Sequence, residues 1–250
     1  MEQRPLPAVI LAAGQGHRLL ESSRGLPKPL MPVLGVPLLE RTVLSCRAAG
    51  ITEGFVVVGY RQELLIPAII GLARRYEMAL QAVENPVWEE GNGTSAAAAA
   101  PFLQGAFFLL MCDHVFEPEM LGHLRTATEA DEADVCRLAV DHRIEEIFDL
   151  PDATKVRLSG QTITAIGKDL VPFDAIDTGL FLCRPVLFEA LERARAQGDS
   201  SLSGGMRQLL SAGKLQAVDI GAHFWSDVDT PASLAYTERM LQARLAQFSA

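Results

Sequence analysis

The sequence predicts a single three-layer α/β domain with an open, mostly parallel sheet and an inserted β-hairpin. Three observations predict it: short apolar runs alternate with helical patterns, the first run ends in glycines, and a hairpin pattern interrupts the alternation later. A strand, helix, strand rhythm implies right-handed parallel crossovers. With 250 residues, of which 49% are hydrophobic, the chain can bury one large core, so we expect one domain over residues 1–250.

The elements follow from these patterns in order. The first strand is uniformly apolar between Pro7 and Gly14, which is typical of a strand covered on both faces. The first helix has one apolar side and ends before Gly50. We expect strands at 8–13, 55–58, 79–83, 106–111 and 176–183, helices at 37–49, 63–76, after 94, at 186–196 and at 234–247, and a hairpin of 155–158 with 162–166.

Charge and composition exclude several classes of function. A net charge of -9 argues against a nucleic-acid surface, which needs a basic stripe. No apolar run approaches the roughly 20 residues of a membrane span, and no export signal opens the chain. The cysteines lack the spacing of a zinc site, which favours buried thiols in a reducing compartment. We therefore expect a cytoplasmic protein without membrane insertion.

The first strand runs into a glycine turn that suits phosphate binding. Gly14 and Gly16 let the backbone turn sharply and approach a ligand, because glycine has no Cβ. Arg18 follows, and Lys28 lies between two prolines that restrict its backbone. An ordinary strand-to-helix turn would also explain the glycines, but the two cations favour a triphosphate site.

Two other phosphate-binding motifs do not fit this turn. A dinucleotide fingerprint needs a third glycine, and Leu19 stands there; the second strand also ends in Gly59 and Tyr60 without a carboxylate for a ribose. A Walker A loop is excluded as well, because Lys168 is followed by Asp169 and lacks the earlier glycine.

Three aspartates are candidate metal ligands. Asp113 directly follows an apolar strand, so its carboxylate is expected at the carboxyl edge of the sheet. Asp227 and Asp229 alternate by two, which on a strand would direct both to one side. Oxygen ligands suit Mg²⁺. From the residues alone, a helix cap at Asp113 and a solvated turn at the pair are equally good explanations.

A second glycine-containing segment precedes the alanine-rich helix. The glycines of residues 91–95 permit close approach to a base or ribose, and a role of Asn92 or Thr94 as the helix N-cap is an equally good explanation. Two histidines adjoin the candidate sites. His114 follows Asp113 and could support a metal ligand, and His17 lies inside the phosphate turn, where a solvent-facing role is equally compatible.

The opening motif resembles that of the sugar-phosphate nucleotidyltransferases. Their pattern is Leu-Ala-Ala-Gly, any residue, Gly, any residue, Arg, followed by Lys-Pro-Leu, and residues 11–18 and 28–30 match it throughout. Later segments are similar to the inositol-1-phosphate cytidylyltransferase branch: residues 91–95, 111–115, 153–157, 166–170, 173–179 and 225–230. The resemblance covers nearly the whole chain. It implies a Rossmann-like nucleotidyltransferase fold of the GT-A type.

The resemblance also implies roles for individual residues. Phosphates of the nucleotide are expected at Arg18 and Lys28, and Mg²⁺ at the three aspartates. Lys168 is expected to neutralise the phosphate of the acceptor, against the alternative of a surface turn lysine. The nucleotide-binding set is Leu11, Ala13, Gly14, Gly16, Arg18, Lys28, Asn92, Gly93, Thr94 and Ser95; the acceptor-binding set is Lys168, Asp177, Thr178 and Gly179; the metal set is Asp113, Asp227 and Asp229.

The reaction implied by the resemblance joins CTP to inositol 1-phosphate and releases pyrophosphate. Another acceptor (a sugar 1-phosphate, phosphocholine or a phosphonate), another nucleoside triphosphate, and a non-catalytic nucleotide-sensing subunit stay open. Members of this branch are often fused to a membrane phosphotransferase. This sequence resembles the stand-alone form, with that partner expected on a separate chain, and a homodimer also stays open.

Overall fold

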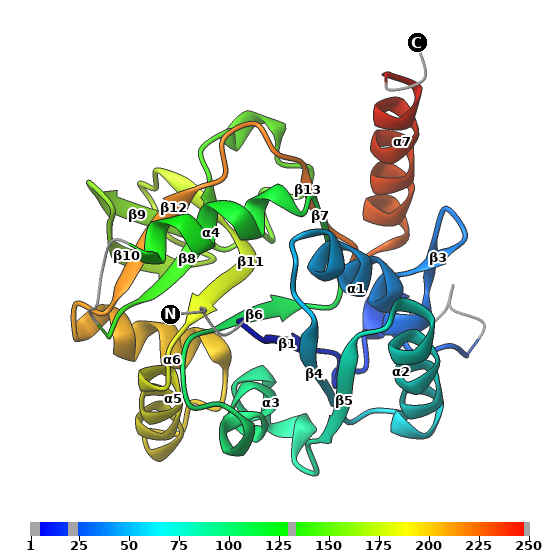
Figure 1. Ribbon diagram of the computed structural model, residues 1–250. Helices are drawn as coiled ribbons and strands as arrows, with labels where there is room; N and C mark the ends of the chain where they lie inside the picture. Colours follow the sequence, from blue (N-terminus) through cyan, green and yellow to red (C-terminus); the bar gives the residue numbers. More distant parts are fainter. Residues whose placement is uncertain (1–5, 20–24, 130–133, 248–250) are drawn as a thin grey trace.

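A mixed nine-stranded sheet forms the centre of the computed structural model, which describes residues 6–19, 25–129 and 134–247 (Figure 1). In spatial order the strands are β5 (Ala79–Glu84), β4 (Glu53–Val58), β1 (Ala8–Leu11), β6 (Phe107–Met111), β11 (Ala175–Cys183), β8 (Cys136–Asp141), β12 (Leu215–Asp219), β10 (Thr162–Gly167) and β9 (Lys155–Ser159).

Strand direction divides this sheet into two parts. From β5 to β6 every neighbouring pair is parallel, as the alternation of strands and helices predicts. β11 is antiparallel to β6, β8 and β9, while β8 and β12 are again parallel. The predicted hairpin is present as β9 and β10, which form the far edge of the sheet. The three-layer α/β class is confirmed, and the sheet is mixed because β11 and β10 run against their neighbours.

Helices cover both faces of the sheet, because the strands are apolar on both sides. In β1, Val9 and Leu11 enter one core cluster, and Ala8 and Ile10 enter the other. The first cluster lies under α3 (Asn92–Ala98), α5 (Val186–Ala196) and α6 (Leu202–Ser211). The second lies under α1 (Leu38–Ala48), α2 (Gln62–Tyr76) and α4 (Glu119–Glu129).

A third, smaller apolar cluster attaches α7 (Pro231–Gln247) to the domain. It includes Val115 and Val228, which lie in or beside a two-stranded sheet of β7 (His114–Phe116) and β13 (Trp225–Asp227). Another small sheet joins β2 (Pro32–Val33) to β3 (Val36–Pro37). Five short 3₁₀ helices complete the described residues: η1 (His17–Leu19), η2 (Lys28–Leu30), η3 (Trp88–Glu90), η4 (Ala100–Phe102) and η5 (Ile144–Glu146).

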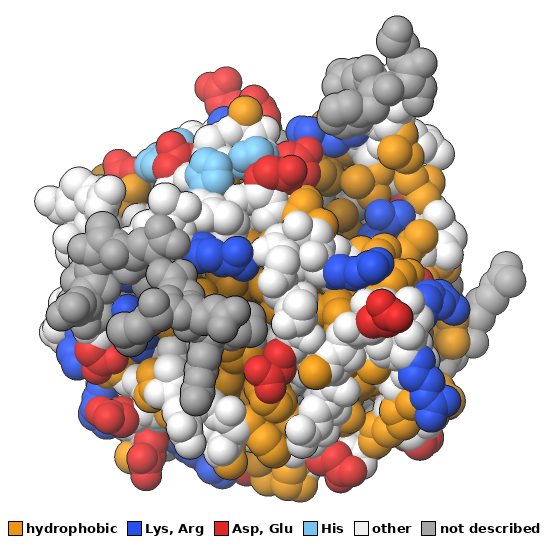
Figure 2. All heavy atoms as spheres, in the orientation of Figure 1, with side chains coloured by type: hydrophobic (Ala, Val, Ile, Leu, Met, Phe, Trp, Pro, Cys, Tyr) orange, Lys and Arg blue, Asp and Glu red, His pale blue; other side chains and the backbone are white. Residues whose placement is uncertain are grey.

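The sequence did not predict every element. The patterns gave no indication of α4, α6, β8 or β12, and α7 begins three residues before the predicted helix at 234–247. On the face shown in Figure 2, acidic and basic side chains are interspersed. Within the described ranges, no helix combines the length and the apolar character needed to cross a membrane.

Candidate active site

The carboxyl ends of β1 and β6 bring the glycine turn beside Asp113. Leu11 pairs with Met111 at the ends of these parallel strands, and the Cys112 N–H donates to the Leu11 carbonyl at 3.2 Å. Parallel neighbours end at the same edge of a sheet, where open α/β folds bind ligands. The turn predicted to bind phosphate and a carboxylate predicted to bind metal therefore share one edge.

Lys28 lies buried beneath the glycine turn, with 7% of the side chain exposed. Gly16 has φ +65°, and a Cβ there would lie 2.7 Å from the Cβ of Lys28. Glycine is therefore required twice, for the turn and for the close approach of the lysine. The Lys28 ammonium donates to Asp113 Oδ2 at 2.6 Å and also to Asp229. Burial lowers its pKa, but these carboxylates outweigh burial and raise it.

Asp152 joins two cations that the sequence analysis treated separately. Arg18 donates from Nη1 to Asp152 Oδ2 at 2.8 Å, and its Nη2 contacts Asp229. Lys168 donates to the other Asp152 oxygen, Oδ1, at 2.5 Å. The hydrogen bonds from Lys168 and Arg18 lower the pKa of the Asp152 carboxyl, so it is ionised. The carboxylate of Asp152 thus bridges Arg18 and Lys168.

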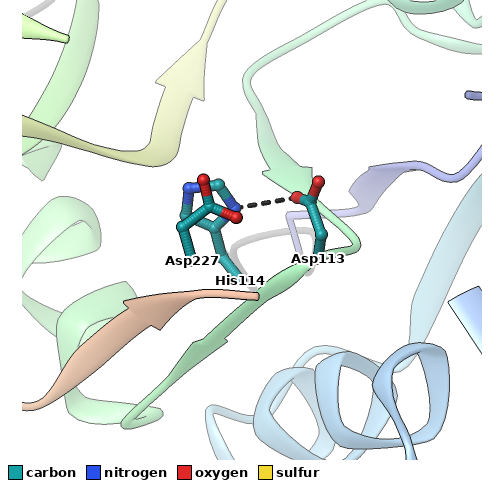
Figure 3. A group of neighbouring side chains, drawn as sticks. All are labelled: Asp113, His114 and Asp227. Atoms are coloured by element: carbon teal, nitrogen blue, oxygen red, sulfur yellow. Dashed lines mark hydrogen bonds and ion pairs between the residues drawn. The ribbon is translucent and has the colours of Figure 1, made fainter. Parts of the chain in front are cut away.

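Asp113, His114 and Asp227 form a compact cluster (Figure 3). His114 pairs with Asp227 across β7 and β13, and each of the three side chains offers a ligand atom within 4.8 Å of the others. His114 Nδ1 lies 2.9 Å from Asp113 Oδ1. Asp227 Oδ1 is buried and has no hydrogen-bond partner among the described residues. A buried carboxylate oxygen without a hydrogen-bond partner is suited to bind a divalent cation. Mg²⁺ fits such a site because it prefers oxygen ligands.

Electrostatics within the cluster support the same interpretation. Burial raises the pKa of Asp227 to about 7, and the nearby Asp113 adds to this rise while His114 opposes it. Burial lowers the pKa of His114, but Asp227 and Asp113 outweigh it and raise the value to about 9. For Asp113, burial raises the pKa, yet Lys28 and His114 lower it overall. Of the two carboxylates, Asp227 is therefore the one that is more easily protonated.

Asp229 does not lie where strand alternation predicted it. β13 ends at Asp227, so Asp229 is outside the strand, and its N–H is held at 2.9 Å by the hydroxyl of Ser233. Its carboxylate contacts Arg18 and Lys28 rather than joining the three-residue cluster. The expectation that Asp229 continues the strand is therefore wrong, although Asp227 and Asp229 both line one cavity.

Two cavities meet at Asp229. One, of about 460 Å³, contains the glycine turn and its cations; its lining includes Leu11, Gly14, Gly16, Arg18, Lys28, Asp113 and Asp229. Ala13 does not line it, because this residue is buried and its carbonyl accepts from the Tyr60 N–H. The other cavity, of about 250 Å³, is lined by Asn92, His114, Asp152, Lys168, Asp177, Gly179, Asp227 and Asp229, among others. The cations predicted for the two substrates therefore line two cavities that share Asp229.

β11 supplies the floor of the second cavity. Burial raises the pKa of Asp177 to about 6, although the N–H of Gly179 donates to this carboxylate at 2.7 Å. Gly179 has φ +73°, and a Cβ there would lie 2.7 Å from His114 Nε2, so glycine lets the cavity reach the metal-ligand cluster. Thr178 is fully buried, and its hydroxyl donates to the Ala139 carbonyl. Of the three predicted β11 residues, only Thr178 faces away from the cavity.

The segment at residues 91–95 is largely occupied with internal contacts. Asn92 lines the second cavity, and its side-chain oxygen accepts from the Leu202 N–H. A Cβ at Gly93 would lie 2.6 Å from the Ser200 carbonyl, so the close approach is to the chain itself. Thr94 and Ser95 are buried and accept from the Asn85 amide. The alternative that Asn92 or Thr94 is the N-cap is wrong, since Gly91 has that position.

Sequence reasoning missed several charged residues of the second cavity, among them Asp141, Arg143 and Asp152. Asp141 accepts two hydrogen bonds from the Arg143 side chain and one from the Trp225 indole. Asp141 ends β8, a strand the patterns did not predict, and Asp152 lies in the following connection. No spacing rule marks these positions, although an acid at the end of an apolar strand is the same signal that identified Asp113.

The chain resembles known nucleotidyltransferases over nearly its whole length. It is 42% identical over 240 residues to the bifunctional IPC transferase and DIPP synthase of Rubrobacter xylanophilus, which covers 94% of this chain and 51% of that protein. The chain thus spans about half the length of this relative. The structure of the inositol-1-phosphate CTP transferase from T. maritima has a TM-score of 0.82 at 25% identity, with 97% of both chains covered.

A more distant structure shares the fold alone. A putative glucose-1-phosphate thymidylyltransferase from Bacillus anthracis has a TM-score of 0.82 at 16% identity and covers 94% of both chains. The model of the MobA-like NTP transferase domain matches residues 8–220, which include the glycine turn, Lys28 and Asp113. With this match over most of its length, the chain belongs to the family of MobA-like NTP transferase domains, which are nucleotidyltransferases.

Proposed function

We propose that the protein is a cytidylyltransferase that makes CDP-inositol and pyrophosphate from CTP and inositol 1-phosphate. The observation that carries this proposal is the meeting of two cavities at Asp229, with Arg18 and Lys28 in one and Lys168 beside the other. Such an arrangement suits two phosphate-bearing substrates that react at a shared boundary. The similarity to proteins named for inositol-1-phosphate transfer supports the choice of substrates.

The first cavity is proposed to bind the triphosphate. Lys28 is buried and charged, and the N–H groups of the glycine turn border the same space. Arg18 is about half exposed, which leaves its guanidinium accessible to a phosphate that approaches from solvent. Charge-assisted hydrogen bonds from these donors would hold the phosphates in a fixed orientation.

The second cavity is proposed to bind the acceptor. Lys168 would neutralise the acceptor phosphate, and the Asp177 carboxyl would receive hydroxyl groups of a polyol. Asp177 lies on β11, whose ladder to the neighbouring strands fixes its position. Several carboxylates line this cavity of about 250 Å³, and such hydrogen-bond acceptors suit a small, hydroxyl-rich acceptor.

The proposed chemistry is one displacement at phosphorus. An oxygen of the acceptor phosphate forms a bond to the α-phosphorus of CTP, and the bond from that phosphorus to the bridging oxygen of pyrophosphate breaks. Pyrophosphate leaves with the electron pair. The nucleophile is already ionised, so no side chain has to remove a proton. The chain contributes alignment and charge neutralisation through Arg18, Lys28 and Lys168.

A divalent cation fits the cluster of Asp113, His114 and Asp227, and we propose Mg²⁺ held by the two carboxylates. When bound, it would offset negative charge on phosphate oxygens. His114 would orient Asp113 through their hydrogen bond. Asp229, proposed from the sequence as a third ligand, would contribute while it also holds Lys28 and Arg18.

The test is a substrate panel with the purified protein and MgCl₂. CTP with inositol 1-phosphate is expected to release pyrophosphate and to give one new phosphodiester signal by ³¹P NMR. UTP, GTP and ATP replace CTP in parallel reactions, and glucose 1-phosphate, phosphocholine and a phosphonate replace the acceptor. Faster turnover with any other pair would overturn the assignment of substrates.

A variant of Asp113 tests its electrostatic contribution to turnover. Asp113→Asn keeps the size of the side chain but removes a charge that balances Lys28. We expect it to lose at least about 100-fold in turnover, in line with the loss of a major electrostatic contribution. If the protein is instead a nucleotide-sensing subunit, CTP will raise the melting temperature of the wild-type protein while every acceptor fails to release pyrophosphate.

For the cellular location we propose the cytoplasm. All four cysteines are free and buried, which supports a reducing compartment. We further propose that CDP-inositol passes to a phosphotransferase, as the second name of the Rubrobacter xylanophilus relative suggests for that protein. Detection of the protein in the soluble fraction of lysed source cells would test the location.

A further inference from the structure

Asp152 holds one cation from each proposed substrate site. Its Oδ2 accepts from Arg18 at 2.8 Å, and its Oδ1 accepts from Lys168 at 2.5 Å. Each carboxylate oxygen is therefore bonded to a different cation. The roles of Arg18 and Lys168 in the two sites rest on the proposed function.

A phosphate would have to compete with this carboxylate. Arginine and lysine bind carboxylates and phosphates through the same charge-assisted hydrogen bonds, so one donor atom cannot fully serve both. The triphosphate needs Arg18, and the acceptor phosphate needs Lys168. Arg18 also contacts Asp229, but Asp229 is additionally held by Lys28 and by the Ser233 hydroxyl. Asp152 contacts one cation of each proposed site.

We propose that Asp152 couples the two substrate sites by competing with the phosphates for Arg18 and Lys168. Two cations hold its carboxylate together. When a phosphate takes the first cation, the carboxylate keeps only one partner and is more easily displaced from the second. Binding at either site therefore favours binding at the other, and thermodynamic linkage makes this effect reciprocal.

The surroundings of Asp152 allow such a displacement. About a third of its side chain is exposed, as are 48% of Arg18 and 56% of Lys168, so the carboxylate can turn into solvent. Its backbone is anchored independently, because its N–H donates to the Asp149 carbonyl at 3.1 Å. Exposed ion pairs contribute little free energy. The pairs of Asp152 with Arg18 and with Lys168 are therefore each expected to weaken phosphate binding by at most about fivefold.

The test compares Asp152→Asn with a control from the same connection. Asparagine preserves the size of the side chain and removes its charge. Glu145→Gln removes the same charge in this connection, at an exposed side chain that lines neither cavity and has no ion pair with any residue that the structure describes. Calorimetry measures the binding of inorganic triphosphate and of inorganic phosphate, each alone and with the other saturating, in one magnesium buffer.

We expect Asp152→Asn to bind each anion alone about three to five times more tightly than the wild type. The factor by which one anion improves binding of the other should fall by a similar amount, while Glu145→Gln should match the wild type. In turnover, Asp152→Asn should lower both KM values and change kcat less than about twofold. Unchanged or weaker binding by Asp152→Asn, or an unchanged coupling factor, overturns the proposal.

The probes separate this inference from the proposed function. Inorganic triphosphate carries no base, and inorganic phosphate carries no inositol, so the coupling is measured whatever the true substrates are. Coupling without CDP-inositol formation would leave the role of Asp152 intact and overturn the proposed function. Formation of CDP-inositol, together with anion binding and coupling in Asp152→Asn that equal those of the wild type, would support the proposed function and overturn the role of Asp152.

Discussion

The ammonium of Lys28 donates a hydrogen bond to the carboxylate of Asp113 across 2.6 Å, although the two residues lie 85 positions apart in the sequence. Lys28 is the buried cation proposed for the triphosphate, and Asp113 is a carboxylate proposed for the metal. Each neutralises the other within the protein. Changes to either residue therefore act on both proposed functions.

Replacing Lys28 with methionine removes the buried charge and keeps much of the volume. We expect kcat/KM for CTP to fall about 100- to 1000-fold, the loss typical of one preorganised electrostatic group. The melting temperature should fall too, because Asp113 and Asp229 lose a shared partner. Steady-state kinetics and thermal unfolding check this. A variant within threefold of wild-type activity would contradict the assignment.

Gly16→Ala tests the close approach of Lys28 to the glycine turn. The added Cβ would lie 2.7 Å from the Cβ of Lys28, in a backbone with φ +65°. Gly160→Ala is the matched control, because Gly160 has φ +60° and nothing lies within 4 Å of its added Cβ. Both should lose about 1–2 kcal/mol of unfolding free energy from the left-handed backbone.

The two alanine variants should differ in activity. Gly16→Ala is expected to lose at least about tenfold more kcat/KM than Gly160→Ala, because a displacement of about 1 Å at a reacting site is costly. Denaturant unfolding and kinetics with CTP measure the two effects. Equal activities would show that the position of Lys28 does not depend on this contact.

Lys168→Ala should act on the acceptor rather than on the nucleotide. We expect KM for inositol 1-phosphate to rise about tenfold or more, from the loss of one charge-assisted contact, with a smaller change in KM for CTP. Lys214→Ala is the control, since Lys214 is also exposed and paired with a carboxylate, that of Asp134. If both KM values rise equally, Lys168 does not distinguish the two substrates.

Asp227 makes stability depend on pH. Its folded-state pKa is raised to about 7, above the value of about 4 expected in an unfolded chain. Between these values the folded state holds a proton that the unfolded state has lost, so its contribution to stability is full below about pH 4 and is lost as pH rises through about 7. At pH 8 this difference in pKa corresponds to about 4 kcal/mol, so Asp227→Asn should melt about 8–16 °C above the wild type.

The same variant provides its own control at low pH. The difference in melting temperature should shrink steadily as the pH falls from 8 toward 4, with metal-free buffer throughout. A difference that is constant over this range would mean that Asp227 titrates normally in the folded protein.

Magnesium binding should follow the ionisation of Asp227. A metal ligand must be deprotonated, so affinity for Mg²⁺ should fall roughly tenfold between pH 8 and pH 6 if the ligand titrates at about 7. Calorimetric titration with MgCl₂ measures this directly. Asp227→Asn should bind more weakly at both pH values and lose the dependence. Equal wild-type affinity at pH 6 and 8 would remove Asp227 from the metal site.

The sequence was informative where a site residue follows directly from the end of a strand. The glycine turn after β1 and Asp113 after β6 are of this kind, because parallel neighbours end at one edge whatever the helices between them do. The hairpin of β9 and β10 was equally accessible, since period-two patterns flank a short turn. These positions depend on local sequence and one rule of topology.

Other positions depend on contacts that local patterns do not contain. The register of β11 against β8 shifts between Asp177 and Phe181, and no local pattern of residues marks this irregularity. Asp152 meets Arg18 across 134 positions through a connection without regular structure. A long-range contact of this type requires the folded arrangement of the chain before it can be seen.

The strand that supplies Asp227 lies outside the nine-stranded sheet. β12 is the last strand along the chain to enter that sheet, and the family match ends at residue 220, yet Asp227 lies beyond both. β13 pairs with β7 in a separate two-stranded sheet, and this pairing brings Asp227 beside Asp113 and His114. Separation of β13 from β7 would therefore dismantle the three-residue cluster while the large sheet stays intact.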